Sequence, residues 1–363
     1  MKAVSRWLRG VRWNVVIISV FVVAILNYAG VFTHIFERDY RTQFSYPLEV
    51  DIPLVIKQLK NSQEPTINPI NGFNYGYLRS CPSKCPTNGP GPRLLIVVKS
   101  ALGNVAKRNV IRKTWGYERR FSDVPICTVF LLGKPTEHAR ALVEEEDTKH
   151  GDIVQGNFID SYFNNTLKTM SGLKWVVDHC PHAQFILFSD DDMYISVKNI
   201  LRFIRNPTAY PTEPKEGKSE KGSRKFAPTF YEDQVDDLQL YAGHIFHSSP
   251  LRHRNSKWYV PLEEYPFSYW PPYATAGAYI LSRRTLLDLY LASMYTKHFR
   301  FDDIFLGLVA TKAKIELLHC PEIYFWKKRY SQHEYENVIA SHGYDDVDEL
   351  SHVWNEQKRL GNA

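Results

Sequence analysis

The chain has 363 residues, of which 44% are apolar and 14% aromatic, so it is too hydrophobic for a disordered protein and must fold. It carries 45 Lys and Arg against 39 Asp and Glu, and four of the basic residues precede position 13: Lys2, Arg6, Arg9 and Arg12. The rest of the chain is nearly balanced in charge, which argues against the basic face that nucleic-acid binding requires.

Residues 13–33 form an apolar stretch without a single charged side chain. At a rise of about 1.5 Å per residue, such a helix matches a hydrocarbon core of about 30 Å, so we expect one membrane span. A cleaved signal peptide is the alternative, but the stretch is longer than a usual signal-peptide core and lacks a convincing cleavage site. The basic residues before it predict a cytosolic tail at residues 1–12 and a lumenal or extracellular chain beyond residue 33.

Two further features suit the secretory pathway. The sequon Asn164-Asn165-Thr166 makes Asn164 a candidate glycosylation site. The chain also has five cysteines, Cys81, Cys85, Cys127, Cys180 and Cys320. Cys81 and Cys85 have the spacing of half a zinc site, but no second pair accompanies them, so we predict disulfides of open connectivity. The odd number leaves at least one thiol unpaired, and Cys127, inside an apolar run, is the candidate for a buried small hydrophobe.

The segments after the span differ in their periodicity. Residues 34–92 lack a sustained pattern and end in a cluster of Pro and Gly, which predicts a stem. From Arg93 onward, short apolar runs alternate with amphipathic helical patterns: strands at 94–98, 126–133, 152–155 and 185–189, and helices at 104–114, 136–150 and 166–179. This alternation predicts a single α/β domain over residues 93–363 with a mostly parallel central sheet. A polar, Lys-rich insertion at 206–230 reads as a surface loop, with a lid near an active site as the alternative.

Three consecutive carboxylates, Asp190, Asp191 and Asp192, directly follow the apolar strand at 185–189. Ligands in open α/β sheets usually bind at the carboxyl edge, and strand geometry lets Asp190 and Asp192 act together there. Hard oxygen ligands at such an edge suit Mg²⁺ or Mn²⁺ together with a diphosphate. Capping of a helix that begins near Ser196 is the alternative, but a cap accounts for one carboxylate and not for three.

A second carboxylate pair, Asp302 and Asp303, lies between apolar residues at the start of a helical pattern. The pair has two interpretations. One aspartate is the N-cap of the helix, or one acts as a general base in a partly desolvated site. Arg108 and Arg112 are four residues apart and share a helix face, where they can contact phosphate oxygens or remain a solvated face.

The last third of the chain adds two candidate features. The aromatic and proline-rich run at 265–273 leads into small residues, and its flat rings suit either a sugar acceptor or ordinary core packing. A short strand at 338–342 ends in His342, which reads as a surface histidine or a Mn²⁺ ligand, before a terminal helix from about Asp346.

These motifs resemble those of the inverting β-1,3-glycosyltransferases, the family of fringe, the β-1,3-galactosyltransferases and the β-1,3-N-acetylglucosaminyltransferases. The matching segments are residues 108–116, 160–169, 190–192 and 273–282. The resemblance extends from Arg93 to the C-terminus and includes the N-terminal anchor. It implies a GT-A-like catalytic domain in the Golgi lumen, held by a single-span type II anchor.

The same resemblance implies a UDP-sugar as donor and Mn²⁺ or Mg²⁺ as cofactor. Asp190 and Asp192 would hold the ion, Asp192 more directly, with His342 as an additional ligand. The residues expected at the UDP-sugar are Arg108, Arg112, Lys168, Asp190 and Asp191.

The catalytic base implied by the resemblance is Asp303. Many family members have Glu where this chain has Asp302, so Asp302 stays a substitute candidate. Segments near the C-terminus look most like a glycolipid-elongating member, which implies transfer of GlcNAc from UDP-GlcNAc to mannosyl-glucosylceramide in β-1,3 linkage. Transfer of galactose from UDP-Gal is the alternative. A non-catalytic sugar-binding surface protein is a third reading, but it would need neither the aspartate triplet nor Asp303.

Overall fold

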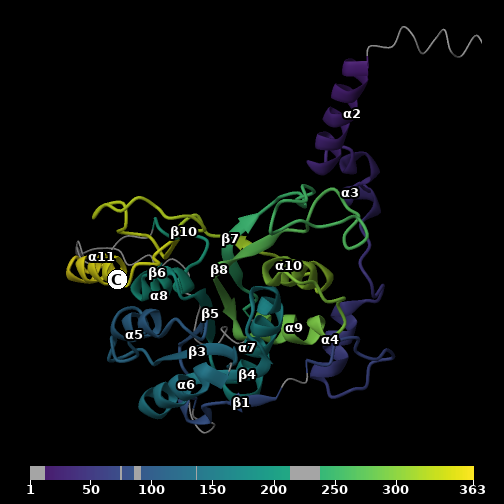
Figure 1. Ribbon diagram of the computed structural model, residues 1–363. Helices are drawn as coiled ribbons and strands as arrows, with labels where there is room; N and C mark the ends of the chain where they lie inside the picture. The colour runs from purple at the N-terminus through teal and green to yellow at the C-terminus, as the bar shows by residue number, and fades with distance from the viewer. Residues whose placement is uncertain (1–12, 74–75, 86–90, 136, 213–237) are drawn as a thin grey trace, which may run out of the picture. The chain divides into compact units, whose positions relative to one another are not determined.

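The computed structural model describes residues 13–73, 76–85, 91–135, 137–212 and 238–363 (Figure 1). The chain divides into two compact units, one formed by Met1–Tyr46 with His247–Pro271 and the other by Pro47–Phe246 with Pro272–Ala363. The predicted tail at 1–12 and residues 213–230 of the predicted insertion lie outside the described residues.

The described residues of the first unit form the α-helices α2 (Trp13–Tyr28) and α3 (Tyr40–Gln43) and the 3-10 turn η1 (Thr33–Phe36). In α2, every described side chain lies at least partly exposed. Arg252 is buried in this unit, where it donates to Glu37 Oε1 at 2.7 Å and to three backbone carbonyls. Within the part of the chain that the structure describes, no helix is both long and apolar enough to span a membrane.

The second unit is built on an eight-stranded sheet of order β1-β4-β3-β2-β5-β8-β7-β9. The strands are β1 (Tyr77–Arg79), β2 (Leu94–Lys99), β3 (Ile126–Lys134), β4 (Ile153–Ile159), β5 (Phe185–Asp190), β7 (Tyr241–Phe246), β8 (Tyr273–Ser282) and β9 (Leu318–His319). The four central strands β4, β3, β2 and β5 are parallel, as predicted. However, β1 and β8 run antiparallel to their neighbours, so the sheet is mixed. Because β8 opposes both β5 and β7, these two strands end at the same edge.

A small second sheet, of order β10-β11-β6, lies beyond the end of β5. Its strands are β6 (Met193–Ile195), β10 (Ile323–Tyr324) and β11 (Ala340–His342). In this sheet β11 pairs antiparallel with β6, and His342 lies opposite Met193. The strand expected at 338–342 is therefore confirmed in its last three residues, and it brings His342 beside the residue that follows the aspartate triplet.

Helices cover both faces of the large sheet. Figure 1 shows α7, α9 and α10, which contact one another, on one side and α5, α8 and α11 on the other. The helices of this unit are α4 (Ile52–Lys60), α5 (Val105–Lys113), α6 (Glu137–His150), α7 (Asn165–His179), α8 (Val197–Arg205), α9 (Arg283–Ser293), α10 (Asp302–Lys312) and α11 (Val347–Arg359), with the 3-10 turns η2 (Pro82–Lys84) and η3 (Tyr162–Asn164). Alternate residues of β2, among them Ile96, pack in one core with Ile111 and Trp354, as strand geometry requires.

The predicted N-termini of two helices are confirmed by their caps. Ser196 caps α8 by accepting a hydrogen bond from the Asn199 backbone, and Asp346 caps α11 by accepting from two backbone N–H groups. The aspartate triplet therefore does not cap α8, because Ser196 does.

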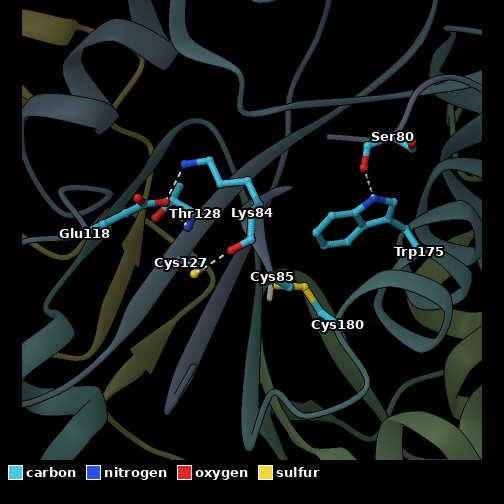
Figure 2. Close-up of a disulfide and its surroundings, with 8 residues drawn as sticks. All are labelled: Ser80, Lys84, Cys85, Glu118, Cys127, Thr128, Trp175 and Cys180. Carbon is cyan, nitrogen blue, oxygen red and sulfur yellow. Dashed lines mark hydrogen bonds and ion pairs between the residues drawn. A yellow bond between two sulfur atoms is a disulfide. The ribbon is translucent and has the colours of Figure 1, made fainter. Parts of the chain in front are cut away.

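The cysteines form one disulfide, between Cys85 and Cys180, which links the segment before β2 to the end of α7 (Figure 2). Cys81, Cys127 and Cys320 are unpaired thiols. Cys127 is thus unpaired as expected, but it is only partly buried, whereas Cys320 is buried. Beside the disulfide, Trp175 Nε1 donates to the Ser80 carbonyl at 2.6 Å.

The segment expected as a stem differs from the prediction from Pro47 onward. Strand β1 pairs with β4, and α4 packs against α9, so the described residues from Pro47 to Cys85 belong to the second unit. Short elements with little periodicity of their own gave no signal of this packing, since their partners lie more than 70 residues further along the chain.

Candidate active site

Lys99 and Asp190 are the last residues of two neighbouring parallel strands, β2 and β5, and lie directly opposite each other in the sheet. Lys99 Nζ is 3.1 Å from Asp190 Oδ1 and 2.9 Å from Asp302 Oδ2. Its side chain is only 4% exposed, so the ammonium group depends on these two carboxylates for its charge compensation. Lys99 thereby joins the predicted aspartate triplet to the predicted carboxylate pair.

The carboxylate pair occupies the first turn of α10, which begins at Asp302. Phe301 is the N-cap residue and makes no side-chain cap, so neither aspartate is the N-cap. Asp302 is buried, and its Oδ2 also accepts a hydrogen bond from Thr169 Oγ1 of α7 at 2.7 Å. Negative charge in this turn is favoured by the helix dipole, and Lys99 and Thr169 fix the orientation of the Asp302 carboxylate.

The two carboxyl groups have opposite pKa shifts. Burial raises the pKa of Asp302, but the ammonium group of Lys99 outweighs it and holds that pKa below its usual value. Burial, and then the negative charge of Asp302, raise the pKa of the half-buried Asp303 to about 7. Neighbouring acids whose environments push their pKa values apart are typical of sites for acid–base chemistry. Asp303 is therefore the group suited to accept a proton near neutral pH.

The members of the aspartate triplet have different surroundings. Asp190 keeps 35% of its side chain exposed, and its pKa is raised to about 6 by burial, with Asp192 and Asp302 adding to the shift and Lys99 opposing it. Asp191 is buried, and its Oδ2 accepts hydrogen bonds from Ser100 Oγ at 2.6 Å and Asn104 Nδ2 at 2.9 Å. Asp191 thus binds the loop between β2 and α5. These hydrogen bonds do not support the expected contact between Asp191 and a UDP-sugar.

Asp192 and His342 approach each other because β6 and β11 pair in register. Their atoms Oδ2 and Nε2 are 3.3 Å apart. The hydrogen bond between them raises the pKa of His342. Burial raises the pKa of Asp192, but the hydrogen bond and the charge of His342 outweigh burial and lower it. Asp192 Oδ1 is buried without a hydrogen-bond partner among the described residues, which leaves one oxygen available to a cation.

Among the residues that the structure describes, no group of three or more His, Cys, Asp or Glu side chains is assembled to hold a metal ion. Asp192 and His342 lie together, but Asp190 is paired with Lys99. The three predicted metal ligands are therefore neighbours without forming a complete site. A metal ion there would need oxygen ligands from a bound substrate.

The two predicted phosphate-binding arginines are used inside the protein. Arg108 is fully buried, and its five N–H groups donate to Glu146, to Ser100 Oγ and to the carbonyls of Ala101 and Leu102. Arg112 makes a two-pronged contact with Asp152, at 2.8 Å for each bond. The shared helix face was correctly predicted, but it faces protein carboxylates. These bonds do not support the phosphate contacts expected of either residue.

Lys168 is likewise buried, with Nζ 2.6 Å from Asp160 Oδ1 and 2.8 Å from the Ser100 carbonyl. Besides Lys99, a second lysine that was not predicted from the sequence approaches the triplet: Lys107 Nζ lies 3.6 Å from Asp191 Oδ1 and 2.7 Å from Asp345 Oδ1.

Lys99, also missed, did carry a signal in the sequence. It is the one charged residue of an otherwise apolar strand, and it ends that strand at the edge where ligands are expected.

The candidate glycosylation site lies at the start of α7. Asn164 is partly exposed, and its Nδ2 donates to the Ile159 carbonyl at 2.8 Å. Thr166 of the same sequon is buried, and its hydroxyl donates to the Phe299 carbonyl. In the folded protein, Asn164 is therefore accessible to solvent, whereas Thr166 is part of the core.

Comparison of the sequence with known proteins assigns the chain to a family. A model of the galactosyltransferase family matches residues 106–219 and 224–321, which hold the aspartate triplet and the carboxylate pair. The chain is 42% identical to β-1,3-galactosyltransferase brn (brainiac) of Drosophila melanogaster over 92% of both chains. It is 30% identical to β-1,3-galactosyltransferase 1 of Homo sapiens, over 79% of this chain and 80% of the relative.

Among solved structures, galactosyltransferase LgtC in complex with donor and acceptor sugar analogs aligns with 74% of this chain and all of its own, at 12% identity and a TM-score of 0.37. That similarity is too low to inform the function. The family match and the sequence identities, in contrast, agree with each other over most of the chain. The chain therefore belongs to the galactosyltransferase family, and it is a glycosyltransferase.

Proposed function

We propose that the protein transfers one sugar from a UDP-sugar to a hydroxyl group of a glycan or glycolipid, in β-1,3 linkage and with inversion at the anomeric carbon. The observation that carries this proposal is Asp303. It is a carboxyl group with a pKa raised to about 7, and its neighbour Asp302 is held ionised by Lys99 at 2.9 Å. An inverting transferase needs one base of this kind and no nucleophile from the protein.

In this mechanism Asp303 accepts the proton of the acceptor 3-hydroxyl. The acceptor oxygen attacks the anomeric carbon from the face opposite UDP, so the new C–O bond forms as the bond to UDP breaks. The bonding electron pair leaves with the diphosphate, and an α-linked donor gives a β-linked product. Asp302 acts through its charge, because a negative neighbour raises the proton affinity of Asp303. Lys99 and Thr169 hold Asp302 in this state.

The leaving diphosphate would lie at the triplet. Asp192 and His342 would hold Mn²⁺ or Mg²⁺, supported by their 3.3 Å approach and by the unpartnered Asp192 Oδ1. When bound, the ion neutralises the charge that develops on the diphosphate. Asp190 would join them with a carboxylate whose Oδ1 is paired with Lys99. Lys107, beside Asp191, adds positive charge on the same side.

For the donor and acceptor, we favour GlcNAc from UDP-GlcNAc and a mannosyl-glucosylceramide glycolipid. The support is the likeness of the C-terminal segments to a glycolipid-elongating member of the family. Galactose from UDP-Gal is the second candidate, since the relatives at 42% and 30% identity are both named as galactosyltransferases. A non-catalytic sugar-binding protein is disfavoured, because sugar binding alone gives no reason for a buried Lys99–Asp302 pair beside Asp303.

The experiment that tests this function compares the two donors. The purified full chain is incubated with Mn²⁺ and an alkyl β-mannoside, and with either UDP-GlcNAc or UDP-Gal. We expect GlcNAc transfer in excess of galactose transfer, and transfer of either sugar at least about 100-fold slower by the Asp303→Asn variant. Galactose transfer alone would reverse the donor assignment, and sugar binding without transfer to any mannoside, lactoside or glycolipid would reject the enzyme.

We also propose that the protein is a type II Golgi membrane protein with a lumenal catalytic unit. Support comes from the uncharged stretch at 13–33, the exposed apolar side chains of α2, the Cys85–Cys180 disulfide and the Asn164 sequon. In cells, glycosidase treatment should increase the gel mobility of the wild-type chain and leave Asn164→Gln unchanged. A chain whose mobility does not change, and whose catalytic unit is digested by protease added outside sealed Golgi vesicles, would contradict this topology.

A further inference from the structure

A group of aromatic side chains gathers at the end of β7, outside the carboxylate site. We call it the aromatic platform, and it consists of His244, Phe246, Tyr273, Phe325 and Trp326. Phe246 ends β7 and lies opposite Tyr273, the first residue of β8. Because β7 and β5 run in the same direction, the platform lies at the same edge of the sheet as Asp190.

The rings of the platform form a continuous set. Phe246 stacks on Tyr273 with centroids 5.7 Å apart and an interplanar angle of 28°, and it meets Phe325 edge-on at 4.6 Å. His244 contacts Phe325 at 4.8 Å and Trp326 at 5.6 Å. Its Nδ1 lies 3.1 Å from the Ile323 carbonyl, a hydrogen bond that fixes the imidazole between the strand and the two outer rings.

The outer rings face solvent. Phe325 is 42% exposed and Trp326 46% exposed, whereas His244, Phe246 and Tyr273 are half-buried beneath them. Contiguous exposed apolar side chains are typical of ligand-binding surfaces. Rings that offer both an apolar face and a polar edge, as Trp and Tyr do, suit a ligand that is itself apolar on one face and polar around its rim.

The platform adjoins the proposed base through α10. A Cβ atom placed on Gly307 would lie 2.6 Å from Tyr273 Cβ and 2.9 Å from the Pro272 carbonyl, so α10 and the start of β8 are in close contact at this glycine. Gly307 follows Asp303 by four residues, which places both on one face of the helix about one turn apart. Tyr273 thus packs on the same face of α10 that carries Asp303.

We propose that the aromatic platform binds the acceptor, with the apolar face of an acceptor sugar ring packed on Trp326 and Phe325. This rests on the proposed function, because it assigns the acceptor side of that reaction. The donor side is occupied by the triplet, two strands away in the sheet. A sugar on the platform would extend from the outer rings along Tyr273 toward Asp303, where its hydroxyl loses the proton.

The test uses three variants of the full chain in detergent: Trp326→Ala, Trp326→Phe and the control Tyr117→Ala. Tyr117 is similarly exposed, at 49%, but lies beside Glu118, which binds the Thr128 backbone at the opposite, amino end of β3. The KM for an alkyl β-mannoside, the turnover number and the hydrolysis of UDP-sugar without acceptor are measured for each.

We expect Trp326→Ala to raise the acceptor KM about tenfold, the worth of one aromatic stacking contact, with donor hydrolysis unchanged. Trp326→Phe should retain most of the affinity, and Tyr117→Ala should behave as wild type. An unchanged KM in Trp326→Ala would overturn the proposal. So would a loss seen only with glycolipid embedded in vesicles and not with the soluble mannoside, because that result assigns the rings to the membrane.

Calorimetric titration of the alkyl β-mannoside onto the same proteins separates this inference from the proposed function. If the wild type transfers no sugar, the proposed function fails. Binding by the wild type that is lost in Trp326→Ala would still support the platform. If the wild type transfers sugar but Trp326→Ala binds the mannoside equally well, the platform assignment fails and the proposed function stands.

Discussion

Asp303→Asn is expected to lower the rate of sugar transfer by about 10²- to 10⁴-fold, the usual contribution of a general base. The variant keeps the size of the side chain but replaces the proton acceptor with a neutral amide. Affinity for the UDP-sugar should remain nearly unchanged, because Asp303 lies outside the triplet. Steady-state kinetics together with donor binding by calorimetry give the two quantities separately.

The matched control is Asp302→Asn, one residue away in the same helical turn. Asp302 is bound by Lys99 and Thr169, so its loss should disturb the site through the charge of Lys99 and should also lower the pKa of Asp303. Near-normal turnover of Asp303→Asn with an intact circular dichroism spectrum would reject the base. Full loss in Asp302→Asn with full activity in Asp303→Asn would transfer the role to its neighbour.

The same assignment has a pH signature. Asp303 must be deprotonated to act, and its pKa is raised to about 7, so kcat/KM should increase as the pH rises through about 7. In Asp302→Asn, the midpoint of this rise should move to lower pH, because the negative charge that raises the pKa of Asp303 is gone. A wild-type profile with its acid limb near pH 4, the range of an ordinary carboxyl group, would contradict the shifted base.

Removal of divalent cations is expected to reduce transfer at least about 100-fold, because several kcal/mol of charge stabilisation on the diphosphate is lost. Without a cation, the diphosphate would face Asp190 and Asp192 directly. Mn²⁺ added after chelation should restore the rate. His342→Gln should raise the Mn²⁺ concentration needed for half-maximal rate, since His342 is 3.3 Å from Asp192.

Asp192→Ala should lose most of the response to Mn²⁺, and Tyr117→Ala serves again as a control outside the site. Isothermal titration of Mn²⁺ in the presence of UDP measures the same ligands without turnover. Unchanged activity in excess chelator would remove the metal ion from the mechanism. An unchanged Mn²⁺ requirement in His342→Gln would remove only the histidine.

The fold could be predicted from the sequence where local periodicity decides it. The apolar runs that became β2, β3 and β5 are buried on both faces, and a parallel sheet covered by helices requires such continuous runs. The antiparallel insertion of β8 between β5 and β7 could not be predicted in the same way. Strand order depends on pairing between distant segments, such as Ile186 with Leu281, which no local pattern encodes.

In the candidate site, too, features set by local sequence could be predicted, and contacts between distant residues could not. A run of three aspartates at a strand end marks the edge of a sheet by itself, so the triplet was visible in the sequence. The protein partners of Arg108 and Arg112 could not be predicted, because spacing reveals a common helix face but not what faces it. Both arginines pair with Glu146, which lies 38 residues after Arg108 and has its Oε1 2.8 Å from Arg112 Nη2. The ion pair between Lys99 and Asp302 could not be predicted, because these residues lie 203 positions apart in the sequence.

In the proposed mechanism, inversion at the anomeric carbon follows from direct attack by the acceptor oxygen, assisted by Asp303 as the single base. The most direct test is the NMR spectrum of the product that the full chain forms from an α-linked UDP-sugar and an alkyl β-mannoside. We expect a β-configured anomeric proton and a linkage to O3 of the mannose. An α-linked product would contradict direct attack assisted by Asp303.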